Sequence, residues 1–443
     1  MFEFGRELRR LLGAGAVQGD LDPALLELFD TAMLVTHARA ADTDAGRVST
    51  RDPYPALIRA SMLWRELARR TGDPVALRKA AQAAQAAARA GKTAGDTARG
   101  TLEQGLASLT GVDLYGDLAL LSAAAERLRA AAGAVGDLLF EARLEFAWAR
   151  LASREALAGD SFARAMEAAA LFDAAVHGLD RLADERASSA ARLEAAQARI
   201  ERADLLAGFG VRRQDARLLE EAASDLRRVV ESLDCDYEPI TWGRACEVLG
   251  SILVSLGELG AGAEHIAEGV SVLVHSGEGA DRDASPLDWA RARHALAVGL
   301  QALGEACDSE AAFDQAETAF DEACEVIGAQ PLALRATVAN NRAACLARVA
   351  ERRGDLPALN RAEAVFKAEL ALAEPGQDPV SWAVLQVNLA RVYEARADLI
   401  GHFAEREAAI YALEEALDVF CEHGLKTLTE TASIGLERVR AAA

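Results

Sequence analysis

The sequence contains few aromatic residues and few prolines, and each shortage narrows the range of possible folds. Aromatic residues make up 5% of the 443 residues, and there are 10 prolines, 34 glycines and 6 cysteines. These numbers exclude a collagen-like chain and a small disulfide-stapled fold. No apolar run approaches the roughly 18 residues of a membrane-spanning helix, so we expect no membrane span. Since 51% of the residues are apolar, the chain can bury a core, which excludes low-complexity disorder.

Catalytic and metal-binding motifs are missing as well. The sequence contains no HExxH, no Walker loop, no G-x-S-x-G and no C-x-x-C pair. The clusters Gly13-x-Gly15 and Gly257-x2-Gly260-x-Gly262 follow no strand, so we interpret them as turns between helices. Seven histidines show no close ligand spacing: His37, His177, His265, His275, His294, His402 and His423. We therefore predict a protein that is not an enzyme, with no catalytic residue, no metal site and no cofactor.

The charge is acidic and unevenly distributed. The chain has 48 basic and 69 acidic residues, a net charge of −21, which opposes binding to nucleic acid. Residues 51–100 carry 10 basic and 4 acidic residues, whereas residues 231–330 carry 4 basic and 20 acidic ones. The six cysteines lie in the second half, several at helix-core positions, which favours reduced thiols. Residues 1–6 show no basic leader before a long apolar core, so we expect a cytoplasmic protein.

Alanine is the dominant residue, and the prolines recur at a nearly regular spacing. There are 100 alanines, which favour long helices, and no alternating strand pattern of useful length. Because proline suits the first turn of a helix, we predict that a helix opens at each of four prolines spaced 47, 45 and 48 residues apart: Pro239, Pro286, Pro331 and Pro379. Three of them are followed by a tryptophan after three residues and by a leucine seven residues later, namely Trp242/Leu249, Trp289/Leu296 and Trp382/Leu389.

A second helix is expected in every unit. Its marker is a small residue followed four positions later by a large apolar one, at Ala222/Leu226, Gly269/Leu273, Ala316/Phe320, Ala362/Phe366 and Ala409/Leu413, with intervals of 47, 47, 46 and 47. Three Gly-Asp pairs should end one helix in a left-handed turn and cap the next: Gly72-Asp73, Gly116-Asp117 and Gly354-Asp355. The markers extend backwards to positions 80, 124 and 168, which makes about eight helix pairs.

This repeat predicts an all-α fold, an α-α superhelix of about eight antiparallel helix pairs with capping helices at both ends. We divide the chain into capping helices at 1–50, degenerate helical repeats at 51–230, clearer repeats at 231–423 and a C-terminal capping helix at 424–443.

The repeat residues resemble those of the tetratricopeptide (TPR) family. The resemblance rests on Asn388-Leu389-Ala390-x-x-Tyr393, on Ala409-x3-Leu413-x2-Ala416 and on Ala316-x3-Phe320-x2-Ala323. The P-x-x-W-A openings at 286–290 and 379–383 are similar to a bacterial subtype. The resemblance is good over 239–423 and weak over 51–230, and the unit of about 47 residues departs from the usual length of about 34. It implies a non-catalytic protein that binds peptides or protein domains along a concave groove lined by the first helix of each pair.

Polar residues of the predicted first helices are the candidates for partner binding. We predict a role for seven of them, with an internal or surface contact as the alternative: Asn340, Asn341, Arg342, Gln386, Asn388, Arg391 and Arg293. Asn388 matches the position at which the family often contacts a peptide backbone, and an asparagine amide both donates and accepts hydrogen bonds. The arginines could bind carboxylates through two nitrogens.

Two further segments leave their roles open. The basic stretch could form a patch for an acidic partner, for a second copy of the chain or for nucleic acid, or it could be a solvated face, and its candidates are Arg59, Arg65, Arg69, Arg70, Arg78 and Lys79. The amphipathic segment from Phe2 to Leu12 could contact a membrane or a partner helix, or cap the first repeat.

The predicted function is a cytoplasmic scaffold or adaptor that binds a protein or peptide partner in its groove, with self-association left open. The alternative is a regulator that senses a peptide or a small metabolite through the same groove.

Overall fold

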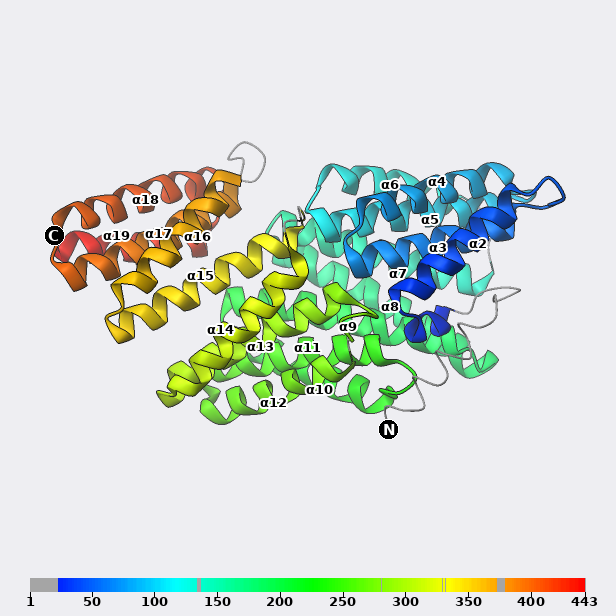
Figure 1. Cartoon of the computed structure of the whole chain (residues 1–443). Helices are drawn as coiled ribbons and strands as arrows, with labels where there is room; N and C mark the ends of the chain where they lie inside the picture. Colours follow the sequence, from blue (N-terminus) through cyan, green and yellow to red (C-terminus); the bar gives the residue numbers. More distant parts are fainter. Residues whose placement is uncertain are drawn as a thin grey trace. The chain divides into compact units, whose positions relative to one another are not determined.

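The computed structural model describes residues 23–133, 137–279, 281–328, 330, 332–372 and 379–442, and every regular element in these ranges is helical (Figure 1). A short 3-10 helix, η1 (Pro23–Leu28), and helix α2 (Thr31–Gly46) precede the helix pairs. The first members of the pairs are α3 (Tyr54–Thr71), α5 (Ala94–Tyr115), α7 (Leu138–Ala158), α9 (Ser189–Arg213), α11 (Pro239–Leu256), α13 (Pro286–Cys307), α15 (Ala333–Arg353) and α17 (Pro379–Ile400). The second members are α4 (Pro74–Ala90), α6 (Ala119–Ala131), α8 (Phe162–Arg186), α10 (Ala216–Ser232), α12 (Ala263–Gly279), α14 (Glu310–Ile327), α16 (Leu356–Leu372) and α18 (Phe403–Glu422), and α19 (Lys426–Ala442) comes last.

The prediction of an all-α fold built from eight sequential antiparallel pairs is confirmed. From α10 onward, the second helices begin at Ala216, Ala263, Glu310, Leu356 and Phe403, so their starts recur every 46 or 47 residues. The step of 54 residues between the markers Ala168 and Ala222 exceeds the others because α8 and α9 are each 25 residues long, longer than every other described helix of the array.

The local signals at helix ends act as predicted. Pro239, Pro286 and Pro379 are the first residues of α11, α13 and α17, whereas Pro331 lies outside the described residues. Gly72 adopts the left-handed conformation (φ 72°) at the end of α3, and the Asp73 side chain accepts a hydrogen bond from the backbone N–H of Val75 at 2.7 Å. The pairs at Gly116 and Gly354 repeat this arrangement.

Small residues allow the two helices of a pair to pack closely. The α11–α12 pair shows the reason most directly, since a Cβ atom on Gly269 would lie 2.7 Å from the carbonyl oxygen of Gly250. A Cβ atom on Gly250 would lie 2.9 Å from the carbonyl oxygen of Gly269. Glycine at both positions therefore brings the two backbones into contact, which no larger side chain permits.

The helices divide into two units, which we describe separately. Unit 1 comprises Met1–Gly299 with Gln330–Ala333, and unit 2 comprises Leu300–Ala329 with Leu334–Ala443. In both units the core consists of alanine, leucine and phenylalanine clusters shared by neighbouring helices, as a stacked repeat requires. The division into 1–50, 51–230, 231–423 and 424–443 follows repeat quality rather than packing, and it stays a prediction.

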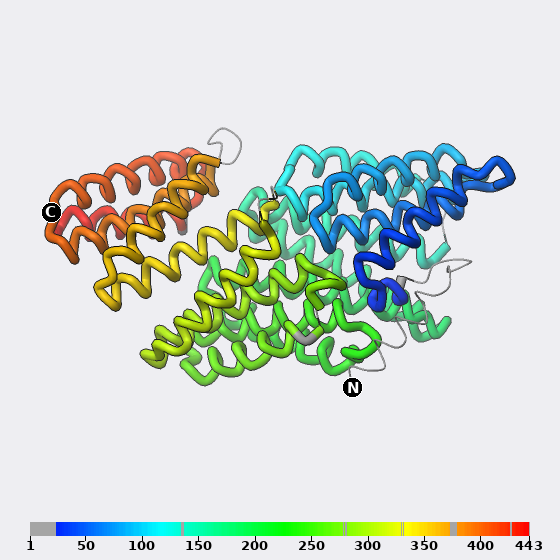
Figure 2. The backbone as a smooth tube through the Cα atoms, in the orientation of Figure 1, coloured from blue at the N-terminus to red at the C-terminus, as the bar shows by residue number. Residues whose placement is uncertain are grey.

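The beginning of unit 1 contacts its end. Thr31 Oγ1 donates to the backbone carbonyl of Asp283 at 3.0 Å, and Arg70 Nη1 donates to that of Ala284 at 3.2 Å. The 3-10 helix η1 packs against α9 and α11. Figure 2 shows this contact, in which the blue segment at η1 lies beside green helix ends. The row of first helices in unit 1 thus returns from α13 to α3.

The six cysteines differ in their exposure to solvent. Cys246 and Cys345 are buried within helices. Cys307, the last residue of α13, and Cys421, next to the last residue of α18, are exposed. Residues 2–12 and the Gly13 cluster lie outside the described residues, whereas Gly260 and Gly262 form the predicted turn with φ values of 114° and 97°. Within the ranges that the structure describes, no helix is both long enough and apolar enough to cross a bilayer.

Candidate binding site

The first helices of unit 1 enclose a cavity of about 380 Å³, which we call the central basin. Its lining side chains come from α3, α5, α7, α9, α11 and the first turns of α13, together with Glu27 of η1. None of the described second helices contributes to the lining. The basin is therefore built from the same element of each successive pair.

The basin is lined by equal numbers of cationic and anionic side chains. The cations are six arginines: Arg65, Arg69, Arg150, Arg154, Arg244 and Arg291. The anions are six carboxylates: Glu27, Glu66, Asp113, Glu201, Asp204 and Asp288. Four apolar side chains also line the basin, namely Leu114, Phe146, Ile200 and Ile240. An amphipathic ligand of mixed charge matches such a surface better than a purely apolar one.

Four charged residues connect α5, α7 and α9. Arg150 and Arg154 lie one turn apart on α7, and each donates to Asp113 at 2.8 Å. Their other nitrogens lie 3.0 and 2.8 Å from the carboxylate of Glu201. Burial alone would raise the pKa of Asp113, but the charges of Arg154 and Arg150 outweigh burial and lower it to about 2. Asp113 is therefore charged at neutral pH.

A second charged group connects α3 with α13. Arg69 donates to Glu66 at 2.9 Å and to Asp288 at 2.8 Å, and Arg291 donates to Asp288 at 2.9 Å. Burial would raise the pKa of Asp288, but Arg69 and Arg291 lower it to about 2. Burial likewise opposes ionisation of Glu66, and the charges of Arg69 and Arg70 hold its pKa well below the ordinary value.

Glu27 reaches the basin from η1 and accepts hydrogen bonds at the N-terminus of α11. Its Oε2 accepts from the backbone N–H groups of Ile240 and Thr241 at 2.8 and 3.0 Å, and its Oε1 accepts from Thr241 Oγ1 at 2.7 Å. These donors belong to the first turn of α11, where backbone N–H groups have no partner within the helix. Burial raises the pKa of Glu27, and the Thr241 hydrogen bonds and the charge of Arg70 oppose that rise.

The two charged groups also influence one another. The charge of Arg291 on α13 helps to lower the pKa of Asp113 on α5, and the charge of Asp288 helps to raise that of Arg244 on α11. Charges on different first helices of unit 1 therefore act on one another within the basin.

A smaller pocket in unit 2, which we call the unit 2 groove, contains two of the residues predicted for partner binding. Asn388 and Arg391 of α17 line this space of about 230 Å³ together with Gln301 and with alanines of α15 and α17. Arg391 is exposed. Asn388 donates to Asn340 Oδ1 at 2.7 Å, so the asparagines of adjacent first helices are in contact.

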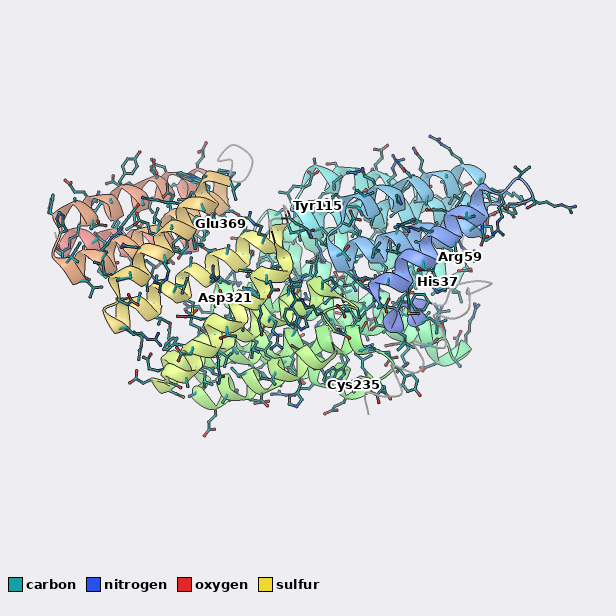
Figure 3. All side chains as sticks on the ribbon, viewed as in Figure 1. His37, Arg59, Tyr115, Cys235, Asp321 and Glu369 are labelled. Carbon is teal, nitrogen blue, oxygen red and sulfur yellow. The ribbon has the colours of Figure 1, made fainter. Side chains whose placement is uncertain are left out.

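The other residues predicted for partner binding contact neighbouring side chains. Asn340 donates to Asn341 at 3.3 Å, Gln386 donates to Glu415 at 2.7 Å, and Arg342 donates to Asp321 at 2.7 Å. The guanidinium of Arg293 lies 5.1 Å from the ring centre of Trp289. Figure 3 labels Asp321, the partner of Arg342, on α14. Their role in binding stays a prediction.

The basic residues of 51–100 do not share one face. Arg70 is only 1% exposed and donates to Glu66 and to three backbone carbonyls, so it belongs to the interior. Arg65 and Arg69 line the basin, Arg59 pairs with Asp44 at 3.4 Å, and Lys79 lies 4.0 Å from the ring centre of Trp64. Arg78 is exposed on α4.

Most of the basin was not anticipated from the sequence. Only Arg65 and Arg69 were among the predicted residues, and their predicted context was a surface patch. The available signal was the spacing of charged residues on first helices, such as Arg150 and Arg154 four positions apart on α7. Within the described ranges, no group of three or more histidine, cysteine or acidic side chains is arranged to hold a metal ion.

The sequence matches no family model and no curated protein. Among solved structures, a Rap protein complexed with Competence and Sporulation Factor is similar, with 11% identity and a TM-score of 0.49 over 88% of this chain and 99% of that one. Aspartyl phosphate phosphatase F from Bacillus subtilis has 10% identity and a TM-score of 0.40, covering 96% of both chains. A signal-transduction ATPase with a tetratricopeptide repeat sensor from Pyrococcus horikoshii has 13% identity and a TM-score of 0.47, covering 91% of this chain and 55% of that one.

The architecture of this chain is TPR-like. This description rests on its sequential antiparallel helix pairs, whereas the bacterial subtype with its longer unit stays a prediction.

Proposed function

We propose that this protein is a non-catalytic adaptor that binds a segment of a protein or peptide partner in the central basin. The observation that carries the proposal is the basin itself, a cavity of about 380 Å³ to which six successive first helices of unit 1 contribute charged and apolar side chains. A preformed surface of this kind needs little ordering when a partner binds. The unit 2 groove, lined by Asn388 and Arg391, would offer the partner a separate contact.

The test is affinity capture from the native host with two matched variants. Gln197 of α9 is half-buried and lines the basin, so Gln197→Trp would fill part of the cavity. Met166 of α8 is 43% exposed and does not line the basin, so Met166→Trp places the same side chain on a second helix. We expect the first variant to lose a partner that the wild type and the second variant retain.

Unchanged capture by Gln197→Trp would contradict the proposal. Because a tryptophan in the basin could disturb folding, melting temperature and helicity are measured for all proteins. If Gln197→Trp is unstable, Gln197→Arg, whose longer side chain is flexible, takes its place with Met166→Arg as its control.

A regulatory role is the second candidate, and one observation favours it. The contact between Arg69 and Asp288 that links α3 with α13 forms part of the basin wall. A peptide or small metabolite in the basin could therefore shift the closure of unit 1 and change its affinity for another partner. Thermal stabilisation of the purified protein by a small metabolite would support this role, and stabilisation by peptides alone would favour the adaptor.

A further inference from the structure

The arginines of the central basin are already paired with carboxylates of the same chain. Arg65 lies 3.2 Å from Glu103, and Arg69 binds Asp288 at 2.8 Å. Arg150, Arg154, Arg244 and Arg291 each have a carboxylate partner as well. An anionic ligand would have to displace one of these carboxylates. Displacement would leave a buried charge without its partner, which is strongly unfavourable.

The carboxylates of the basin are not equally covered. The Asp288 side chain is only 6% exposed, whereas the Asp204 side chain on α9 is 52% exposed. Asp204 pairs with Arg244 Nη2 at 2.7 Å, and Arg244 also pairs with the more deeply buried Glu247. Asp204 can therefore turn towards another cation while Arg244 keeps Glu247 as its partner. Breaking an exposed ion pair of this kind costs little free energy.

Arg154 is a second cation near Asp204, because the charge of Asp204 contributes to the raised pKa of Arg154. The guanidinium of Arg154 already lies 2.8 Å from both Asp113 and Glu201. Its charge is compensated by these two carboxylates, so it does not prevent a ligand cation from reaching Asp204.

The electrostatic field around the basin also favours a cationic ligand. Within unit 1, residues 231–299, which include α11, α12 and the first turns of α13, carry 4 basic and 12 acidic residues. The basic stretch 51–100 does not offset this field at the basin, because Arg65 and Arg69 are neutralised by Glu103 and Asp288. A negative field attracts cations into a cleft and repels anions.

Apolar side chains define the rest of the site. Leu114, Phe146, Ile200 and Ile240 contribute to the lining of the basin. Resting on the proposed function, we infer that the partner segment bound in the basin is basic and presents a lysine or arginine to Asp204 beside an apolar side chain. The same geometry disfavours an acidic peptide, whose carboxylates would meet arginines that are already paired.

Two peptide libraries test this inference on the full-length protein. Both contain the same leucine and phenylalanine positions, and the remaining positions are lysine in one library and glutamate in the other. We expect the lysine library to bind about tenfold more tightly at low salt, and raising the salt concentration should weaken its binding. Equal binding, preference for the glutamate library, or no binding of either library would overturn the inference.

A matched pair of variants locates the site. Asp204→Asn should weaken binding of the lysine library several-fold. Asp173→Asn should leave it unchanged, because Asp173 of α8 is 60% exposed and pairs with one arginine at 2.8 Å but does not line the basin. Equal effects of the two variants would overturn the assignment to Asp204.

This test separates the inference from the proposed function. If Gln197→Trp abolishes partner capture but the glutamate library is preferred, the adaptor role stands and the basic partner is wrong. If Gln197→Trp has no effect on capture, the adaptor role itself fails, whatever the libraries show.

Discussion

Arg69 and Asp288 are 219 positions apart in the sequence, yet Arg69 Nη1 donates to Asp288 Oδ2 at 2.8 Å. This hydrogen bond joins α3, the first helix of the first pair, to α13. Asp288 also accepts from Ser285 Oγ at 2.5 Å and from Arg291 at 2.9 Å, and its side chain is 6% exposed. A row of stacked hairpins needs contacts only between neighbours, so this long-range link helps to close unit 1, together with the hydrogen bonds of Thr31 to Asp283 and of Arg70 to Ala284.

Neutralising Asp288 should therefore destabilise unit 1. Asp288→Asn leaves Arg69 and Arg291 without one of their charge partners, and we expect the free energy of unfolding to fall by about 3 kcal/mol. Denaturant titration followed by circular dichroism measures the change. Asp173→Asn is the control on a second helix and should change the value by less than about 0.5 kcal/mol. Equal effects of the two substitutions would show that the closing contact contributes no stability.

Acid should weaken the fold in a defined pH range. Asp113 and Asp288 have pKa values of about 2 in the fold, below the ordinary value of 3.8. A lowered carboxyl pKa contributes stability above the unfolded-state value, and that stability is lost as the pH falls through the folded-state value. We expect each residue to contribute roughly 2 kcal/mol above pH 4 and to lose it between about pH 4 and pH 2. In Asp288→Asn the free energy of unfolding should change less steeply over this range, and an unaltered slope would contradict the assignment.

His294 of α13 should make the free energy of unfolding depend on pH in a higher range than the two aspartates do. Burial lowers the pKa of His294 from 6.5 to about 4, so the folded protein binds fewer protons than the unfolded chain between these values. The free energy of unfolding should then rise with pH by up to about 1 kcal/mol per unit from pH 4 to 6.5. The comparison of wild type with His294→Gln isolates this contribution. A histidine proton resonance for His294 that titrates near pH 6.5 would show that the side chain is not shielded from solvent.

The unit 2 groove can be tested separately from the basin. Asn340, Asn388 and Arg391 lie on α15 and α17, where Asn388 donates to Asn340 at 2.7 Å and Arg391 is exposed. If they form a separate contact with the partner, replacing all three by alanine should reduce partner capture severely while helicity and melting change little, since each side chain is at least partly exposed. Undiminished capture would restrict the interface to unit 1.

The helices and their pairing could be predicted from the sequence because they depend on local signals. Pro239 and Pro286 begin helices, Gly72 with Asp73 ends one helix and caps the next, and Gly250 with Gly269 allows close packing. Each of these signals acts within a few residues or between consecutive helices. A period of 46 or 47 residues repeats them, which makes the pattern visible without any knowledge of distant contacts.

The central basin could not be predicted in the same way, because its residues come from helices far apart in the sequence. Arg69 and Arg70 are adjacent in a basic stretch, but one lines the basin and the other is buried against Phe29, Ala284 and Leu26 carbonyls. Their carboxylate partners include Asp288, which sequence spacing does not connect with α3. The closure of unit 1 determines which arginines face solvent. The composition of residues 51–100, by contrast, indicates only a basic patch.

Site-specific photo-crosslinking tests the proposed adaptor role most directly. A photo-reactive amino acid replaces Gln197 within the basin in one protein and Met166 on α8 in another, and both full-length proteins are irradiated in the native host. Our account predicts a covalent adduct with a protein or peptide partner from position 197 and none from position 166. An adduct from position 166 alone, or the same adducts from both positions, would show that the partner does not bind in the basin.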